Sequence, residues 1–219
     1  MGRLGQWPRL VGAWLIVAGL TVAYPGVARA GGQAPQQVQD LAQTRRDRVH
    51  VFLVNGVDLL NAGNMTGLRD FIRQLGFVHV HEGQVYDLFA FQDDIRRLHR
   101  EEPDAHIVLI GFSLGANVVH EIASGIDDNG AKIDLMVYLS GNHVVMPLPR
   151  SRPANVGRVL NLLAGGLMEK YGFRDYAENI RVAGSRHFTL PTHPLTLEAL
   201  ERELAAVAGS VVIPMQPPR

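Results

Sequence analysis

Two patterns of apolar residues alternate along this chain. Short runs of consecutive apolar residues, many of them β-branched, predict buried strands, whereas apolar residues at every third or fourth position predict amphipathic helices. The runs predict strands over residues 49–54, 77–80, 106–110, 133–139 and 179–183. The helical pattern covers residues 67–75, 86–100, 116–124, 155–170 and 195–208, and Thr66 is the predicted N-cap of the first of these helices.

This alternation of strands and helices predicts the fold class. A helix between two strands is typical of a right-handed crossover, so the strands should form a mainly parallel sheet with helices on both faces. The nearly continuous apolar strands agree, because a strand that is buried on both faces need not alternate. The sequence therefore predicts an α/β fold, in the form of a three-layer αβα sandwich around one mainly parallel sheet.

The first thirty residues have the pattern of an export signal. Arg3 and Arg9 precede the apolar run of residues 10–27, and residues 28–30, Ala-Arg-Ala, match the A-x-A cleavage site. The alternative is an uncleaved membrane anchor, since the run just reaches the length that spans a bilayer. Pro25 and the small residues near the cleavage site favour a cleaved signal peptide, which would comprise residues 1–30. We therefore expect an exported protein, either periplasmic or extracellular.

The rest of the chain is expected to form one domain with irregular ends. Residues 31–48 begin with a stretch rich in Gln, Gly and Ala that has no sustained period, so they are expected to be a mobile leader. Residues 49–208 contain all the predicted strands and helices and are numerous enough for one full hydrophobic core. Residues 209–219, with three prolines, are expected to trail as a tail.

Charge and composition exclude several kinds of function. The chain has 21 basic and 21 acidic residues, and without the three arginines of the signal it has 18 basic residues against 21 acidic ones. This slightly negative balance gives no reason to expect a nucleic acid as a partner. The chain has no cysteine, which excludes disulfides, a thiolate zinc site and a cysteine nucleophile.

The strand predicted over residues 106–110 ends in Gly111-Phe112-Ser113-Leu114-Gly115, which matches the motif G-x-S-x-G. In this motif the serine lies on a strained strand-to-helix turn that exposes its hydroxyl, and the glycines avoid collisions with neighbouring elements. The following helix N-terminus, with the N–H of Leu114, would face negative charge on a bound carbonyl oxygen. A nucleotide-binding turn is disfavoured, because neither G-x-G-x-x-G nor a lysine-bearing phosphate loop is present.

On two motifs the sequence resembles the α/β-hydrolase superfamily, especially small members without a cap domain, such as cutinases and compact lipases. One motif is G-F-S-L-G-A at residues 111–116. The other is His187-Phe188, followed by Pro194 and a final predicted helix, which is similar to the histidine loop of the superfamily. The resemblance covers residues 49–208 and implies a Ser-His-acid triad in the chain order serine, acid, histidine.

Among nine histidines, His187 is the candidate general base. It lies between the last predicted strand and the last predicted helix, from where it can reach a serine at the edge of the sheet. His193 is the second choice and is more typical of the start of the final helix, and His143 is the third. His79 and His81 form an H-x-H pair that could bind a metal, but such a pair is usually a surface feature, so no metal is expected.

The second hydrogen-bond donor to the carbonyl oxygen is expected in the loop after the first strand. In the superfamily this loop often begins with His-Gly, whereas this chain has Asn55-Gly56-Val57-Asp58. The glycine matches and the histidine does not. We assign one donor to the backbone N–H of Val57, with Gly56 allowing close approach, and the other to the backbone N–H of Leu114.

The residue that orients the imidazole has three candidates, of which Glu178 lies directly before the last predicted strand and thus nominally at its wrong end. Asn142 follows the strand after the serine motif, where some members of the superfamily carry the carboxylate. Asp175 comes just before the last predicted strand and would reach the site if residues 173–177 fold over it. An asparagine can orient an imidazole but stabilises an imidazolium less than a carboxylate does, so Asp175 is slightly favoured.

Together these residues predict an exported serine hydrolase of carboxylic esters that forms an acyl-enzyme on Ser113 and needs no cofactor. The lack of an inserted cap domain predicts an open site for a small-molecule or lipid ester, compatible with contact to a membrane surface. The alternative is a non-catalytic binding or cell-envelope module with a decayed triad, which the missing carboxylate at Asn142 favours. Acyl transfer through the same intermediate is a third hypothesis. Nothing in the sequence predicts an oligomeric state.

Overall fold

Parallel strands form the centre of the part of the chain that the computed structural model describes, residues 41–56, 62–127, 130–141, 149–166 and 172–212. The six strands of this part are β1 (Val49–Asn55), β2 (His79–Gln84), β3 (His106–Phe112), β4 (Ile133–Leu139), β5 (Val156–Leu163) and β6 (Glu178–Arg181). They lie in the order β2-β1-β3-β4-β5-β6, and every neighbouring pair is parallel. The predicted α/β fold class is confirmed.

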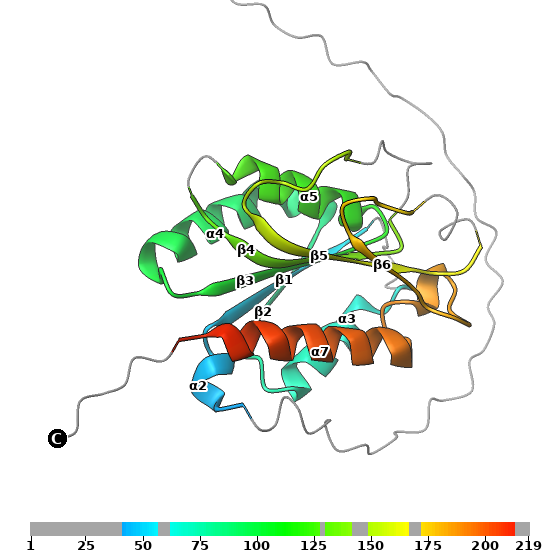
Figure 1. Ribbon diagram of the computed structural model, residues 1–219, viewed down its shortest axis with the longest axis horizontal. Helices are drawn as coiled ribbons and strands as arrows, with labels where there is room; N and C mark the ends of the chain where they lie inside the picture. Colours follow the sequence, from blue (N-terminus) through cyan, green and yellow to red (C-terminus); the bar gives the residue numbers. More distant parts are fainter. Residues whose placement is uncertain (1–40, 57–61, 128–129, 142–148, 167–171, 213–219) are drawn as a thin grey trace, which may run out of the picture. The chain divides into compact units, whose positions relative to one another are not determined.

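Helices cover both faces of this sheet (Figure 1). The helices α4 (Leu88–Glu101) and α5 (Gly115–Gly125) lie on one face, and α3 (Met65–Gln74) and α7 (Pro194–Ser210) lie on the other. The short helix α2 (Gln43–Arg46) lies beside α7. Two 3-10 turns, η1 (Val85–Asp87) and η3 (His187–Thr189), precede α4 and α7. The described chain is therefore a three-layer αβα sandwich.

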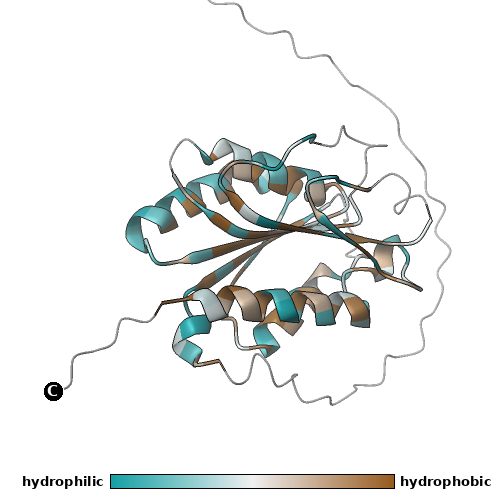
Figure 2. Cartoon of the chain, in the orientation of Figure 1, coloured by the Kyte–Doolittle hydropathy of each residue, from teal (hydrophilic) through white to brown (hydrophobic). Residues whose placement is uncertain are grey.

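Alternate residues of the central strands point to opposite faces of the sheet. In β1, Val51 and Leu53 pack in the core that includes residues of α3 and α7, whereas Phe52 and Val54 pack in the core that includes residues of α4 and α5. Figure 2 shows the result as brown strands between helices that are teal on part of their surface. This burial on both faces is the physical origin of the continuous apolar runs.

The helix predicted over residues 155–170 is wrong, because residues 156–163 form β5 between β4 and β6. The apolar residues at positions 156, 159, 160 and 163 have helical spacing, but every residue from 159 to 163 is buried. The polar side chain among them, Asn161, is accommodated because its amide nitrogen donates to the carbonyl of Gly172 (2.8 Å) and to Oδ1 of Asn179 (2.7 Å). Residues 167–170 of the predicted helix lie outside the described residues.

Several predicted boundaries also differ from the structure. The N-cap of α3 is Asn64 rather than Thr66, because Oδ1 of Asn64 accepts from the N–H of Gly67 (3.1 Å). The second strand covers residues 79–84 rather than 77–80, since β2 pairs with β1 on one side only and its polar residues keep partial access to solvent. The helix α2 lies in the stretch 31–48 for which the sequence predicts a mobile leader, and α7 extends to Ser210.

The predicted signal peptide, residues 1–30, lies outside the described residues. In the part of the chain that is described, no helix has the length and apolar character needed to cross a membrane.

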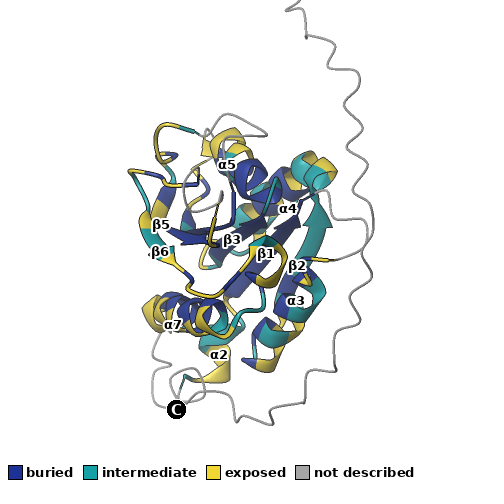
Figure 3. Ribbon diagram, turned by 90° about the vertical axis from the view of Figure 1, so that its right-hand side faces the viewer, coloured by how far each residue is buried: buried dark blue, intermediate teal, exposed yellow. Residues whose placement is uncertain are grey.

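The carboxyl ends of all the described strands lie at one edge of the sheet, which we term the carboxyl edge. This edge is at the right of Figure 1, where α7 begins in orange, and it faces the viewer in Figure 3. Ser113 follows β3 and His187 follows β6, so the topology brings both candidates to this edge. Ligands of open α/β sheets bind beyond the carboxyl ends of the strands, so the carboxyl edge is the expected place for a functional site.

Three imidazole rings stack across β1 and β2. The ring centroid of His50 lies 4.3 Å from that of His79 and 5.9 Å from that of His81, with nearly parallel planes. Burial and the neighbouring His79 lower the pKa of His50 from 6.5 to about 4, although Glu102, 3.7 Å away, offsets part of this effect. Within the described residues no group of side chains could hold a metal ion. The ring of His79 stacks on His50, and the ring of His81 stacks on Phe52 with the centroids 4.5 Å apart.

We predict that this stack makes the protein less stable in acid. Below pH 6.5 the unfolded chain binds a proton at His50 that the folded protein does not bind, so stability is lost as the pH falls from 6.5 toward 4 and is retained above 6.5. Between pH 7.5 and pH 5, His50 alone should lower the free energy of unfolding by about 2 kcal/mol in urea denaturation. His50→Phe, which keeps a ring and removes the titration, should lose less on acidification. Equal losses in both proteins would contradict this account.

Candidate active site

The turn between β3 and α5 holds Ser113 in a left-handed backbone conformation. Its φ is 55°, which a non-glycine residue adopts only where its surroundings impose it. A Cβ atom on Gly111 would lie 2.2 Å from the carbonyl oxygen of Gly115, and a Cβ atom on Gly115 would lie 2.1 Å from the carbonyl oxygen of Val54. Both glycines of the motif are therefore required by close backbone packing, as the sequence predicts.

His187 contacts the hydroxyl of Ser113. Its Nε2 atom lies 3.0 Å from Oγ of Ser113, although the two residues are 74 positions apart in the chain. The turn η3 holds His187 in place, because the carbonyl of Arg186 accepts from the N–H groups of Thr189 and Leu190, both at 3.0 Å, and Leu190 is fully buried. The structure thus brings the predicted nucleophile and the predicted base into hydrogen-bond contact.

The phenyl ring of Phe112 packs against the imidazole of His187. The two ring centroids are 4.9 Å apart with planes inclined by 30°, and Phe112 is fully buried. The ring of Phe188 makes edge contacts with both, 4.9 Å from His187 and 6.4 Å from Phe112. These two aromatic rings restrict the orientation of the imidazole. Sequence reasoning missed this role of Phe112, for which the signal is an aromatic residue between the glycine and the serine of the motif.

The N-terminus of α5 lies directly after Ser113. The N–H of Leu114 has no acceptor in the described part of the chain, and α5 has no side-chain cap. Unsatisfied N–H groups at a helix N-terminus stabilise negative charge. The end of β1 approaches the same turn, since a Cβ atom on Gly56 would lie 3.1 Å from the nitrogen of Leu114. Val57, the other predicted donor, lies outside the described residues.

The structure does not bring Asp175 to the imidazole. Asp175 is exposed in the segment between β5 and β6, and among the described residues no hydrogen bond or ion pair joins it to His187. The neighbouring Arg174 is the side chain that turns inward, where it contacts Asn117 of α5. Glu178, another candidate, forms an ion pair with Arg158 (2.6 Å). Asn142, the third candidate, lies outside the described residues.

The other histidines have different surroundings. His193 is the N-cap of α7, where its Nδ1 accepts from the N–H of Leu195 (3.3 Å), which confirms its expected place at the start of the final helix. His120 packs on α5 with its Nδ1 3.3 Å from the hydroxyl of Tyr138, and burial together with the charge of Arg174 lowers its pKa to about 4. His143 lies outside the described residues.

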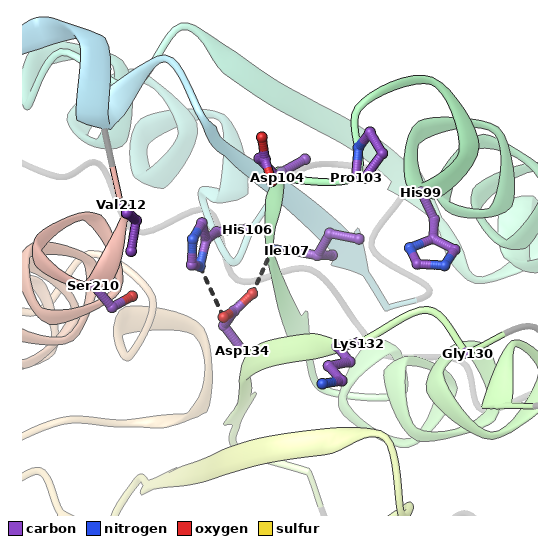
Figure 4. A pocket seen from close by; sticks show the side chains of 11 residues that line it. His99, Pro103, Asp104, His106, Ile107, Gly130, Lys132, Asp134, Ser210 and Val212 are labelled. Carbon is purple, nitrogen blue, oxygen red and sulfur yellow. Dashed lines mark hydrogen bonds and ion pairs between the residues drawn. The ribbon is translucent and has the colours of Figure 1, made fainter. Parts of the chain in front are cut away.

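A pocket of about 420 Å³ lies at the opposite edge of the sheet, where the strands begin (Figure 4). Asp134 accepts from the N–H of Ile107 and lies 2.9 Å from Nδ1 of His106, and this hydrogen bond raises the pKa of His106. The hydroxyl of Ser210 donates to the carbonyl of Val207 in its own helix (2.6 Å). The contacts of Asp134 with His106 and Ile107 join the starts of β3 and β4. The candidate nucleophile, Ser113, lies at the carboxyl edge, on the other side of the sheet from this pocket's edge.

The architecture has counterparts among solved structures. No protein-family model matches the sequence, and no curated protein matches it. A lid-less α/β serine hydrolase from Xanthomonas campestris is similar at a TM-score of 0.50 and 15% identity, over 81% of this chain and 87% of that one. A protein from Pectobacterium atrosepticum described as a YdeN-like hydrolase gives 0.51 and 14%, over 78% and 96%. An arylesterase gives 0.50 and 14%, over 74% and 77%. The chain has the α/β-hydrolase fold.

The topology of this α/β-hydrolase fold restricts where a residue that orients the imidazole can originate. The strands β4 and β5 lie between β3, which leads to Ser113, and β6, which leads to His187. The chain leaves both intervening strands at the carboxyl edge. Asn142 follows β4 in the sequence and Glu169 follows β5, and both lie outside the described residues. Sequence reasoning passed over Glu169, because the helical spacing of residues 155–170 conceals the end of β5.

We predict that Gly115→Ala destabilises the α/β-hydrolase fold at the turn. The added methyl group would collide with backbone atoms of β1, which cannot move aside as a flexible side chain would. Overpacking of this kind should cost about 1–3 kcal/mol in the free energy of unfolding, measured by thermal or urea denaturation.

Gly209→Ala is the matched control. A Cβ atom on Gly209, which is exposed near the end of α7, has no neighbour within 4 Å. This change should leave stability unchanged or raise it by up to about 1 kcal/mol through helix propensity. Equal stabilities of the two variants would refute the packing argument for the motif.

Proposed function

We propose that this protein is a serine hydrolase of carboxylic esters that forms an acyl-enzyme on Ser113. The observation that carries this proposal is the 3.0 Å contact between Oγ of Ser113 and Nε2 of His187 at a strained turn on the carboxyl edge. A hydroxyl is a weak nucleophile until an adjacent base accepts its proton, and this contact supplies the base. The fold shared with solved hydrolases is compatible with the proposal.

The proposed reaction has two halves. Oγ of Ser113 attacks the ester carbonyl while His187 accepts the hydroxyl proton, and the protonated imidazole then donates that proton to the departing alcohol. Water next attacks the acyl-enzyme with His187 as base, which releases the carboxylic acid and restores the serine. In each half, negative charge on the carbonyl oxygen would be stabilised by the N–H of Leu114 and, as predicted from the sequence, by that of Val57.

The surface near the site supports an apolar ester as the substrate. Phe188, directly after the proposed base, is 54% exposed, and Leu195 at the start of α7 is 47% exposed. Both follow β6 and therefore lie toward the carboxyl edge. We propose a small-molecule or lipid ester, hydrolysed outside the cytoplasm after removal of residues 1–30. Neither a metal nor an organic cofactor takes part in this proposal.

We predict that a fluorophosphonate probe labels the wild-type protein and that Ser113→Ala abolishes the labelling. The probe reacts only with a serine that an adjacent base activates. Hydrolysis of p-nitrophenyl esters should fall by more than about 1,000-fold in the same variant.

Ser124→Ala is the control for this experiment. Ser124 is exposed on α5, eleven residues beyond Ser113 in the sequence, and should be inert toward the probe. Labelling that persists in Ser113→Ala would reject Ser113 as the nucleophile.

We also predict that the residue which orients His187 comes after β4 or β5 rather than from position 175. A carboxylate stabilises an imidazolium better than an amide does, so Glu169→Gln should lower kcat/KM by roughly 100-fold to 10,000-fold. Asp175→Asn is the matched control and should change kcat/KM by less than about twofold, since an exposed side chain without contact to the base contributes little. A large loss in Asp175→Asn with none in Glu169→Gln would reverse this assignment.

Two other functions fit the same fold and are separated by the same measurements. A non-catalytic binding module is favoured if the folded wild-type protein neither reacts with the probe nor hydrolyses esters. Acyl transfer gives an acyl-enzyme as well, and is recognised by formation of a new ester when an alcohol acceptor is present.

A further inference from the structure

A buried guanidinium lies behind the first turn of α5. Arg174, in the segment between β5 and β6, is only 2% exposed. Its Nη2 donates to Oδ1 of Asn117 (3.1 Å), its Nη1 donates to the hydroxyl of Tyr176 (3.3 Å), and its guanidinium carbon lies 3.8 Å from the centroid of the Tyr138 ring. The side chain is therefore held by two hydrogen bonds and one cation–π contact.

The charge of Arg174 has no acidic partner among the described residues. Two titratable side chains near it, Tyr138 and His120, are also uncharged near neutral pH. Burial raises the pKa of Tyr138, and burial with the charge of Arg174 itself lowers the pKa of His120 to about 4. Tyr176 contacts Arg174 through its hydroxyl. The cluster that surrounds this charge consists of Arg174, Asn117, His120, Tyr138 and Tyr176. Burial of the positive charge of Arg174 is unfavourable unless a negative charge nearby interacts with it.

The position of this charge relative to the proposed nucleophile follows from two contacts. Asn117, which binds the guanidinium, is four residues after Ser113 and so lies about one helical turn along α5. A Cβ atom on Gly141 would lie 3.0 Å from Nη2 of Arg174, and Gly141 comes two residues after Leu139, whose carbonyl accepts from the N–H of Ser113 (2.9 Å). The guanidinium therefore lies beside the first turn of α5, the helix that begins directly after the turn at Ser113.

We infer that Arg174 is a positioning residue for the proposed hydrolysis, whose uncompensated charge adds to the N-terminal dipole of α5 and favours negative charge at the reacting carbonyl oxygen. The same charge keeps His187 in its neutral, proton-accepting form before the reaction. Among the described residues, His187 contacts Ser113, Phe112 and Phe188. The catalytic part of this inference rests on the proposed function, whereas the effect on His187 does not.

The pKa of His187 in Arg174→Met, followed by NMR titration of the imidazole, tests the electrostatic effect without turnover. Removing a positive charge makes the imidazolium easier to form, so the pKa of His187 should rise by roughly half a unit to one unit. Arg174→Lys, which keeps the charge, should return the pKa to within about 0.2 unit of the wild-type value. An unchanged pKa in Arg174→Met would overturn the inference, whether or not the protein is an esterase.

Asn117→Asp supplies a second route if Arg174→Met does not fold. It places a carboxylate against the guanidinium, so the charge is cancelled while the arginine and its packing remain. The pKa of His187 should rise in this variant too. A pKa that stays at the wild-type value in Asn117→Asp would likewise overturn the inference.

Kinetics then test the catalytic part in an active wild-type enzyme. Arg174→Met should lower kcat about 5-fold to 20-fold with little change in KM, because the charge acts on the transition state rather than on substrate binding. The acid limb of the kcat/KM profile should move to higher pH with the pKa of His187. Arg174→Lys should recover the position of this limb. Equal losses of kcat in Arg174→Met and Arg174→Lys, without movement of the acid limb, would mean that Arg174 only supports the fold.

Discussion

The left-handed backbone at Ser113 is the constraint on which the rest of the site depends. Such a conformation costs on the order of 1–3 kcal/mol and persists only when the surrounding structure holds it. Here the N–H of Ser113 donates to the carbonyl of Leu139, so the turn remains attached to β4. Two backbone approaches that only glycine permits, at Gly111 and Gly115, close it from both sides. As a result the hydroxyl of Ser113 and the N–H of Leu114, which has no acceptor among the described residues, lie next to each other at the start of α5.

The sheet supplies the rigid frame that this turn needs. Every central strand is buried on both faces, so its position is set by two independent cores and not by the loops that follow it. Contacts between His106 and Asp134 and between His50 and His79 join the strands at or near the edge where they begin. At the carboxyl edge, by contrast, Ser113 contacts His187. The two edges differ in this way because every neighbouring pair of the described strands is parallel, so all these strands begin at one edge and end at the other.

Much of the fold could be predicted because burial on both faces leaves a strong mark in the sequence. Five of the strands appear as apolar runs, and the turn at Ser113 appears as a motif whose glycines have a steric purpose. β5 was concealed, since a largely buried strand rich in Val and Leu can have the same apolar pattern as a buried helix. That one ambiguity also concealed Glu169, because a residue is a candidate for the carboxyl edge only if a strand ends before it. The preference for Asp175 failed for a related reason: nothing in the sequence shows that Arg174, rather than its neighbour, turns inward.

The sequence by itself determined the position of the proposed nucleophile and the layered architecture, since both depend on local sterics and on hydrophobic periodicity. It also placed His187 at the correct strand end. Only the tertiary structure decided which imidazole reaches the hydroxyl and which ring packs against that imidazole. It also decided that Arg174 is buried beside α5 with no carboxylate partner among the described residues. These features join residues that are distant in the chain, and they depend on distances of 3–5 Å that no spacing along the sequence encodes.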